Sequence, residues 1–527
     1  MKNITNSNCP KSQAPPGRRR RRINRRAAQL ADPLTLSSHR PRFTYLPDSA
    51  VERLSARAFD LLEQHGVVLT HELMAQKLLG AGAKRSPHES DRYRLPRNMV
   101  AEALAATPGK VKLCGKSPEY DIELPQADGT FTMRTGTGGH GFVDPVTAEY
   151  RNLRKEDAAN IARVGSALDQ IGFMAHPFIN GVPETTADIH GLAEIITNTP
   201  KHVWVQPYEA VNIEYLMQII SLAGGGEAEV RKRPIASCIV CSFSPLEYKP
   251  MDVEAIIHSA GAGLPIHACS LPTSGGTAPL AMSGTVLMAA AEILGIVVMA
   301  HVLGGATPVI ATPLIFALDM RTGRCLQSSV ECMQGATMAI QLMKQGFGLL
   351  THTYGVGSDT PDVDGQSQAE RAMLARAVVL SGADILGGVG QLECATVFSP
   401  VQAILDNELG RMLRRYQAVP EVTDTDLSWR DLLTIKSGGH FLDNETTVKN
   451  CRGTFMPEIF QRADRDEYEK SGRRTARDFA VEKYREILRS PVLKGLPDDS
   501  VIGEIKSLVN TADIRIAGTS KASLTDL

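Results

Sequence analysis

The stretch Leu349–Gln366, LLTHTYGVGSDTPDVDGQ, shows on a small scale how the whole chain is built. A short run typical of a β-strand carries His352 and Tyr354 and ends at Gly355 and Gly357, and an acidic, turn-forming segment then leads into a helical pattern. In proteins built from repeated strand–helix units, such a junction often carries active-site groups, because the rigid strand end aims side chains into a loop-built pocket. We therefore expect the chemistry to be centred here, against the alternative of an ordinary connecting loop.

Helical and strand patterns alternate in the same way along the chain from Lys155 onward. The predicted strands are continuous apolar runs, as expected when both faces of a parallel sheet are buried. These runs are Ile171–His176, His202–Gln206, Ile235–Phe243, Pro265–Ser270, Pro308–Leu314, Gly348–Tyr354 and Ile385–Gly388.

An eighth strand is available in the short run Gly141–Asp144, just before the first helix of the alternating region. The number of strands and the size of the region then favour the α/β class and a (β/α)8 TIM barrel. The rival is an open, doubly wound sheet, but no GxGxxG motif follows a first strand.

The segments on either side of the alternating region have different patterns. The start of the chain is rich in arginine, including Arg18–Arg22, and typical of a solvated basic arm. Helical and short β patterns follow it, and the segment after the barrel is polar and helical. The predicted parts are a disordered basic arm at 1–43, an α+β cap at 44–154, the barrel at 155–415, a helical C-terminal extension at 416–512 and a flexible tail at 513–527.

The amino-acid composition limits which binding partners and which cellular compartment are expected. The chain has 57 basic and 58 acidic residues, and this near-zero net charge gives no reason to expect nucleic acid as a partner. Its nine cysteines are scattered, several of them within apolar runs, which favours a reducing, cytoplasmic environment. No apolar segment of the secretory type follows the arginines. A symmetric homo-oligomer is the default expectation for a soluble enzyme of this kind.

The most apolar stretch, Val286–Leu303, is long enough to raise the question of a membrane span. It contains Glu292 and His301 and is bounded by glycines. These features favour a buried core helix, and we expect no membrane association.

The functional groups of a TIM barrel cluster at the carboxyl ends of its strands. Asn198, in TNTPKH, lies at the opposite end of the barrel by this count. No nucleophile motif of the GxSxG type and no phosphate-binding loop is present, and no metal-ligand set emerges, although His176, His267 and His352 come from strands that can converge. The residues at or just past predicted strand ends include His176, Gln206, Ser270, Thr312, His352, Tyr354 and Glu393.

Aromatic residues make up only 5% of the chain, yet several of them fall near predicted strand ends. Aromatic rings attract cations through their negative faces, so such residues can form a box for a cationic ligand, although most aromatic residues serve packing alone. The aromatic residues in these positions are Phe178, Trp204, Tyr208, Phe243, Phe316, Tyr354 and Phe398.

Four blocks of the sequence resemble the trimethylamine methyltransferase family of corrinoid-dependent methyltransferases, in order and in spacing. They are SGGTAPLAMSGTVLMAAAEIL, TPLIFALDMRTG, YGVGSDTPDVDGQSQAE and GGVGQLE. The resemblance extends from about Arg18 to Pro491. Members active on trimethylamine carry pyrrolysine in the loop before the SD-x-x-x-x-D-G-Q block. In this chain that position falls near Val356 or Gly357, where an ordinary amino acid stands.

This departure makes the chain similar to the non-pyrrolysine branch of the family. The resemblance implies demethylation of a quaternary amine such as glycine betaine, with the methyl group passed to Co(I) of a separate corrinoid protein. A quaternary ammonium leaves as a neutral tertiary amine, so the transfer needs no general acid. The enzyme then orients and desolvates its substrate, and it needs no tightly bound cofactor of its own.

The resemblance and the strand ends together give a set of candidate site residues. Asn198 and His352 resemble polar residues near the corrinoid or the substrate, and are the catalytic candidates. The candidates for substrate binding are Tyr354, Phe316 and Trp204 as cation-facing aromatic residues, Glu393 as a counter-charge to the ammonium, and Arg321 as a partner for a betaine carboxylate.

Three alternatives remain open at this point. The donor can be trimethylamine or another methylated amine. The barrel can belong to a metal-assisted lyase or hydrolase that acts alone. The protein can also be a non-catalytic betaine-binding or corrinoid-docking protein, which would bind its ligand without transferring a methyl group.

Overall fold

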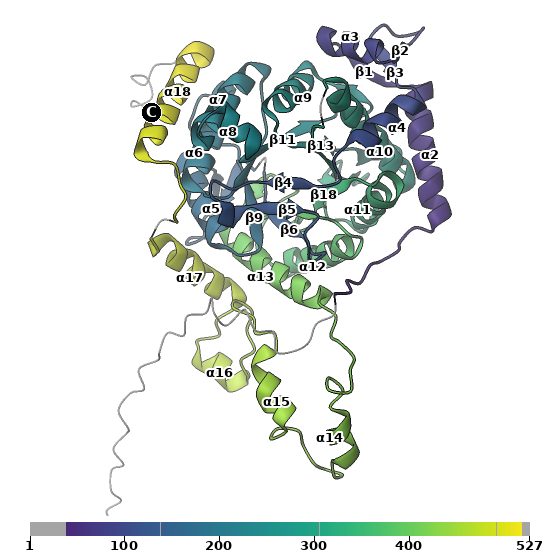
Figure 1. Cartoon of the computed structure of the whole chain (residues 1–527). Helices are drawn as coiled ribbons and strands as arrows, with labels where there is room; N and C mark the ends of the chain where they lie inside the picture. Colours follow the sequence, from purple (N-terminus) through teal and green to yellow (C-terminus); the bar gives the residue numbers. More distant parts are fainter. Residues whose placement is uncertain (1–37, 138, 305, 492, 519–527) are drawn as a thin grey trace, which may run out of the picture. The chain divides into compact units, whose positions relative to one another are not determined.

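The computed structural model describes residues 38–137, 139–304, 306–491 and 493–518 of the 527-residue chain. At its centre, eight parallel strands form a closed barrel surrounded by helices (Figure 1), so the predicted (β/α)8 TIM barrel is confirmed. Around the barrel the strands are ordered β10 (His202–Val205), β11 (Ala236–Cys241), β13 (Ile266–Ser270), β15 (Val309–Pro313), β18 (Leu350–Tyr354), β19 (Ile385–Val389), β6 (Thr132–Thr135) and β9 (Ile171–Ala175).

The helices around the strands include α5 (Lys155–Ala167), α6 (Ala187–Asn198), α7 (Ile213–Gly224), α8 (Glu227–Lys232), α9 (Pro250–Ala262), α10 (Met282–Val302), α11 (Val330–Gln341), α12 (Gly365–Leu380) and α13 (Pro400–Gln417). Short strands in the loops form two further sheets. One joins β14 (Thr273–Ser274), β16 (Phe316–Leu318) and β17 (Cys325–Leu326), and the other joins β20 (Gln391–Leu392), β21 (Val397–Phe398), β7 (Gly141–Val143) and β8 (Tyr150–Asn152).

The eighth barrel strand is not the one that we predicted. The segment Gly141–Asp144 contributes β7 to the sheet with β8 and β21, whereas β6 closes the barrel between β19 and β9. The sequence of β6 is TMRT, and all four residues are buried, including Arg134. A short run with a central arginine lacks the apolar signature of a barrel strand, which is why the pattern favoured the wrong segment. The barrel therefore begins inside the segment predicted as a cap.

The segment before the barrel shares its hydrophobic core with the barrel helices. Helices α2 (Asp48–Gln64) and α4 (Arg97–Ala106) pack against α10. Helix α10 is long and apolar enough to cross a membrane, but 78% of its apolar window is buried, as predicted for a core helix. The other elements of this segment include α3 (Glu72–Gly80) and the strands β1 (Val67–Leu69), β3 (Arg92–Arg94) and β2 (Lys84–Arg85). These strands form a four-stranded sheet with β12 (Glu247–Tyr248), which lies in the loop between β11 and α9.

A hairpin of β4 (Val111–Leu113) and β5 (Ile122–Leu124) covers the amino end of the barrel. Its apolar residues pack against inward-facing residues of the barrel strands, such as Phe173 and Ile310. The backbone N–H of Cys114 donates to the carbonyl oxygen of Pro234, just before β11. The amino end is therefore closed by apolar packing, and access to the interior is left to the carboxyl end.

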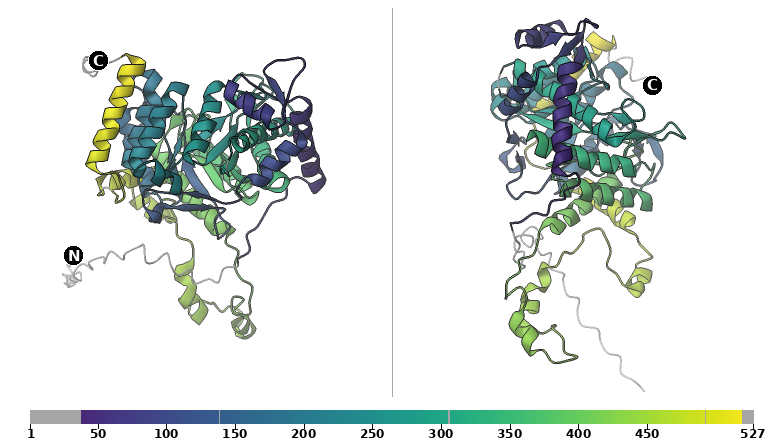
Figure 2. Two further views of the ribbon diagram at one scale, coloured as in Figure 1. Left: turned by 45° about the horizontal axis from the view of Figure 1, so that its top comes forward. Right: turned by 90° about the vertical axis from the view of Figure 1, so that its right-hand side faces the viewer.

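The segment after the barrel divides into two parts. Residues 420–455 belong to a compact unit of their own, with the short helices α14 (Trp429–Thr434) and α15 (Glu445–Asn450). The remainder forms α16 (Arg465–Lys470), α17 (Ala476–Arg489) and α18 (Asp499–Ala512). Helix α17 packs against α13 and α5, and α18 packs against α6 and α7 (Figure 2).

Helix α18 does not end at the predicted start of the flexible tail. It continues as a π-helical turn, Asp513–Ala517, in which Asp513 is buried. The carboxylate of Asp513 accepts a hydrogen bond of 2.6 Å from the hydroxyl of Thr186 and lies 3.1 Å from Nε2 of His190, and these polar contacts extend the ordered chain. Residues 519–527 of the predicted tail, and residues 1–37 of the predicted arm, lie outside the described residues.

A buried ion pair holds the loops that follow β18 and β19. Arg371 of α12 and Asp406 of α13 are fully buried, with Nη1 2.9 Å from Oδ2. The guanidinium also donates to the carbonyl oxygens of Val356 and Gln391, and Asp406 accepts from the backbone N–H of Gly390 at 2.8 Å. One charged pair therefore ties two helices to the backbone at two neighbouring strand ends.

Substitution Asp406→Asn leaves Arg371 buried without its counter-charge, so we expect a loss of about 3 kcal/mol or more in the free energy of unfolding. Urea unfolding followed by circular dichroism measures this loss. The control is Asp466→Asn, at an exposed position of α16, which should stay close to the unsubstituted protein. Equal stability of the two variants would contradict a stabilising role for the pair.

Candidate active site

The centre of the barrel holds a charged side chain, Arg134 of β6, that is fully buried. Its Nε donates to Nε2 of His352 at 3.2 Å, and its Nη1 donates to the carbonyl oxygen of Thr135 at 2.6 Å. The guanidinium carbon lies 4.0 Å from the centre of the Trp204 ring. Burial lowers the pKa of this guanidinium to about 10, so Arg134 remains charged at neutral pH.

A chain of hydrogen bonds runs from His352 towards the amino end of the barrel. Nδ1 of His352 lies 3.3 Å from Nδ1 of His267, and Nε2 of His267 lies 3.1 Å from the hydroxyl of Ser237. The same hydroxyl lies 2.9 Å from Nε2 of His202, whose Nδ1 lies 3.0 Å from the carbonyl oxygen of Cys114. The chain therefore joins five barrel strands, counting β6, to the loop after β4.

The two ends of this chain fix the positions of its protons. A guanidinium only donates, so Nε2 of His352 carries no proton and its Nδ1 donates to His267. A carbonyl oxygen only accepts, so Nδ1 of His202 donates and its Nε2 accepts from Ser237. His267 then donates to Ser237 through Nε2, and all three rings are neutral.

Burial favours the same neutral state. It lowers the pKa of His202 to about 3. The pKa values of His267 and His352 are lowered well below 6.5 by burial, and the charge of Arg134 lowers them further. None of the three rings is therefore protonated at neutral pH.

Two of the predicted cation-facing residues meet at the carboxyl end of the barrel. Tyr354 ends β18 and Phe316 begins β16, and their ring centroids are 6.0 Å apart at an interplanar angle of 74°. Both side chains are buried, with exposed fractions of 7% for Tyr354 and 8% for Phe316. Burial raises the pKa of Tyr354, so its phenol is neutral. This pair offers two aromatic rings, set edge to face, at the entrance of the barrel.

Trp204 lies deeper than that pair, in the layer of the histidines. Its ring is edge-on to His267 and His352, with centroids 5.9 Å away from each. Its indole Nε1 is buried and has no hydrogen-bond partner among the described residues. Trp204 therefore belongs to the central cluster, with the guanidinium of Arg134 over its ring, and not to the aromatic pair.

Glu393 lies on a strained loop past the end of β19. Three successive residues, Glu393, Cys394 and Ala395, have φ angles of 49°, 50° and 72°, in the left-handed region that side chains other than glycine rarely adopt. Backbone hydrogen bonds from Glu393 to Thr360 (2.8 Å) and from Cys394 to Ser358 hold the loop. Strain of this kind is concentrated at functional sites. Glu393 is exposed at this place.

Two predicted site residues lie apart from the cluster. Asn198 is the last residue of α6, before the amino end of β10, and its amide donates to the carbonyl oxygen of Glu194 at 2.9 Å. Arg321 lies on the turn between β16 and β17, 89% exposed, with Nε 3.2 Å from Oδ1 of Asp319. The structure does not bring either side chain to His352.

His176 does not join the other two histidines of the predicted convergent set. Its Nε2 accepts from the backbone N–H of Gln206 at 2.9 Å, and its ring lies 5.8 Å from that of Tyr208. The residues that sequence analysis missed are Arg134, His202 and Ser237. The signal for Arg134 was a single charge inside a short β pattern, whereas nothing local marked His202 or Ser237.

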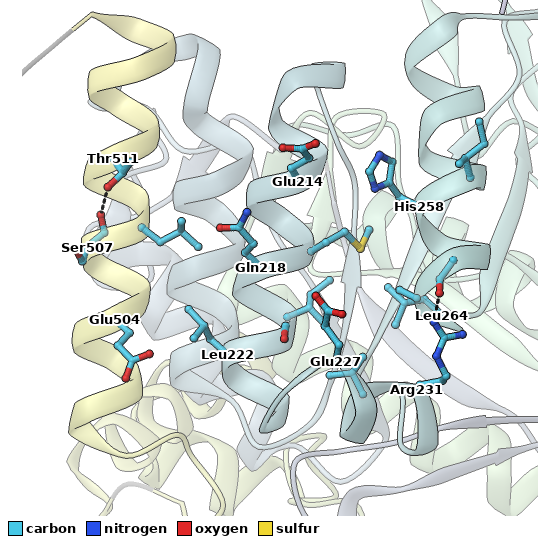
Figure 3. A pocket seen from close by; sticks show the side chains of 18 residues that line it. Glu214, Gln218, Leu222, Glu227, Arg231, His258, Leu264, Glu504, Ser507 and Thr511 are labelled. Carbon is cyan, nitrogen blue, oxygen red and sulfur yellow. Dashed lines mark hydrogen bonds between the residues drawn. The ribbon is translucent and has the colours of Figure 1, made fainter. Parts of the chain in front are cut away.

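A cavity of about 1010 Å³ lies outside the barrel, between α7, α8, α9 and α18 (Figure 3). Its polar side chains include Glu214, Glu227 and Glu504. Because these residues come from the outer faces of helices and not from strand ends, we assign the chemistry to the barrel and not to this cavity.

Comparison with known proteins gives a family match over most of the chain. The family model described as trimethylamine methyltransferase (MTTB) matches residues 15–505. The trimethylamine methyltransferase MttB of Desulfitobacterium hafniense (strain DSM 10664 / DCB-2) is 26% identical over 470 residues, which cover 88% of this chain and 93% of that protein. A glycine betaine methyltransferase of Desulfitobacterium hafniense (strain Y51) is 24% identical over 475 residues, which cover 89% of this chain and 97% of that protein.

A solved structure supports the fold. The monomethylamine methyltransferase MtmB of Methanosarcina barkeri superposes with a TM-score of 0.50 and 13% sequence identity, covering 88% of this chain and 92% of that one. At this identity the likeness concerns the architecture alone.

The buried neutral histidines make stability depend on pH. His202 has a pKa of about 3 when folded and about 6.5 when unfolded, so between these values the unfolded state binds more protons and stability falls as the pH decreases. In His202→Gln, the slope of unfolding free energy against pH from 6 to 4.5 should be smaller by up to about 1.4 kcal/mol per pH unit. Urea unfolding at several pH values measures it. An unchanged slope would mean that His202 is protonated in the folded protein.

Proposed function

The chain belongs to the trimethylamine methyltransferase (MTTB) family, and from this premise we propose that it transfers a methyl group from a quaternary ammonium compound, such as glycine betaine, to Co(I) of a corrinoid carried by a separate protein. The chain is a methyltransferase, and a methylated amine is its substrate. The quaternary donor and the corrinoid acceptor are the proposed part.

The observation that carries the proposal is the fixed proton arrangement at the centre of the barrel. His352, His267 and His202 are neutral, and each of their N–H protons is already donated within the chain. A donor that must be protonated before its amine can leave gains nothing from such groups. A quaternary ammonium needs no proton: the N–CH3 bond breaks, its electron pair stays on nitrogen, and an electron pair of Co(I) forms the new Co–CH3 bond.

The loop after β18 is a second argument for a donor that needs no further activation. A Cβ placed on Gly357 would collide with the side-chain amide of Gln327, which is buried. Gly357 or its neighbour Val356 stands at the place that pyrrolysine takes in the trimethylamine-active branch. A long side chain at 357 would therefore have to displace Gln327.

The residues at the entrance have the chemistry that such a donor requires. The rings of Tyr354 and Phe316 can face the methylated ammonium. Exposed Glu393 can counter its charge. The enzyme's contribution is then to exclude water and to hold one N–CH3 bond in line with the approaching cobalt.

We propose further that the protein binds no cofactor tightly, works in the cytoplasm and forms a homo-oligomer. The eight cysteines in the part of the chain that the structure describes are free thiols, which is compatible with a reducing compartment. The corrinoid enters as the substrate group of the partner protein.

Trimethylamine is the second candidate donor, because several relatives near 26% identity act on it by name. The deciding experiment is methylation of free cob(I)alamin, followed by its change in absorbance, with quaternary amines and trimethylamine supplied one at a time. We expect methylcobalamin with a quaternary amine and none with trimethylamine. The reverse result would replace the proposed donor, and folded protein that methylates neither free cobalamin nor a corrinoid protein would count against the transfer itself.

Substitution His352→Ala removes the acceptor of Arg134 Nε and interrupts the hydrogen-bond chain beneath the aromatic pair. We expect kcat for demethylation to fall roughly 10- to 100-fold through misplacement of the groups around the donor, with the fold retained. Circular dichroism checks the fold, and the cobalamin assay measures the rate. His258→Ala, on the outer helix α9, is the control. Unchanged turnover in His352→Ala would exclude the proposed role of His352.

A further inference from the structure

The second terminal nitrogen of Arg134, Nη2, lacks a hydrogen-bond acceptor among the described residues. Nη2 is buried and makes no hydrogen bond with the described residues. The acidic groups that interact with this guanidinium are the Tyr354 phenol, which is neutral, and the Cys269 thiol, and neither is a carboxylate. A charge buried without a counter-charge is strongly unfavourable.

Arg371 shows how the same fold treats a structural arginine. Arg134 and Arg371 are the two arginines buried below 1% exposure in the described part of the chain. Arg371 has a carboxylate, Asp406, at 2.9 Å. Arg134 has a neutral imidazole, a carbonyl and an aromatic ring in the corresponding places. The missing counter-charge therefore points to a ligand that brings its own anionic group.

Strand β19 places only backbone against Nη2, because the residue that faces it is Gly387. A Cβ on Gly387 would lie 2.6 Å from Nη2 of Arg134 and 2.8 Å from Nε2 of His352. A Cβ on Gly388, where φ is 94°, would lie 3.3 Å from the ring of Tyr354. Two successive glycines therefore let the backbone of β19 pack closely against the guanidinium and the Tyr354 ring, and neither residue places a side chain between Arg134 and the aromatic pair.

From this arrangement we propose that Arg134 binds the anionic group of the methyl donor, so that the donor is a zwitterion that carries a carboxylate and a quaternary ammonium. This inference rests on the proposed function and specifies its substrate class. The carboxylate lies deep, at Arg134, and the ammonium lies at Tyr354 and Phe316. One N–CH3 bond then points out of the carboxyl end, where the cobalt approaches.

Arg134 also acts against donors without an anionic group. A simple cation placed at Tyr354 would face an uncompensated positive charge in a site of low dielectric constant, whereas a zwitterion neutralises that charge when it binds. Arg321, which the sequence predicts as a partner for the carboxylate, is exposed and lies 3.2 Å from Asp319. Arg134 is therefore the specificity-determining arginine.

The test compares glycine betaine with its amide, which has the same ammonium and a similar size but no negative charge. Binding is measured by calorimetry, and transfer by methylation of cob(I)alamin. We expect the unsubstituted protein to prefer betaine by about 10-fold or more. In Arg134→Gln, betaine should bind about 100-fold more weakly and the preference should disappear, while Arg134→Lys should retain part of it. Arg57→Gln, at an exposed position on α2, is the matched control.

The ratio of the affinities for betaine and its amide distinguishes a role of Arg134 in specificity from a purely structural role. If Arg134 served only to hold His352, Arg134→Gln would weaken the binding of betaine and of its amide by the same factor. The preference for betaine would then remain, and this result would overturn the inference. If Arg134→Gln fails to fold, Gly387→Ala replaces it: a methyl group in front of Nη2 should weaken betaine more than the amide, and equal weakening would also overturn the inference.

The outcomes for binding and transfer are distinguishable. Equal use of betaine and its amide by the unsubstituted protein would overturn the role of Arg134 and leave methyl transfer intact. Selective binding of betaine that depends on Arg134, without methylation of cob(I)alamin or of a corrinoid protein, would support the anion site and refute the proposed transfer.

Discussion

The barrel interior depends on the fact that the guanidinium of Arg134 donates hydrogen bonds and accepts none. With a pure donor at one end and the carbonyl of Cys114 at the other, each proton between them has one possible place. The layer of three histidines and Ser237 is rigid for this reason. The apolar hairpin β4–β5 below it keeps water away, so the pKa values of these rings stay low and the arrangement does not change at neutral pH.

This constraint separates two chemical tasks along the barrel axis. The deep layer carries a permanent positive charge and no proton that is free to move. The entrance carries Tyr354 and Phe316, which are nearly apolar and favour a methylated cation. Acid–base chemistry fits this division poorly. Methyl transfer between a quaternary nitrogen and a strong nucleophile fits it well, because such a transfer needs alignment and dehydration and no proton transfer.

The sequence predicted the barrel well because seven of its strands are apolar runs between helical patterns, and such runs carry the signal of a buried parallel sheet. It failed at β6 because Arg134 interrupts that signal. It singled out His352, Tyr354, Phe316 and Trp204 as candidates because they occupy strand ends or lie near them, and the structure places all four in the barrel or at its carboxyl end. Local patterns cannot show that His202, Ser237 and His267 meet, since the contacts are made between strands distant in sequence. Local patterns also do not show that Arg321, the predicted partner for a carboxylate, lies on an exposed turn beside Asp319.

Sequence similarity cannot decide the donor, because a relative named for trimethylamine and one named for glycine betaine are 26% and 24% identical to this chain. The decision rests on charge. Trimethylamine has no anionic group to neutralise Arg134, and its protonated form would add a second positive charge to the barrel interior. Arg371 shows that this fold supplies a carboxylate where a buried arginine has only a structural role. An arginine left without one, beside two glycines and beneath two aromatic rings, is arranged for a ligand whose negative and positive groups lie a short distance apart.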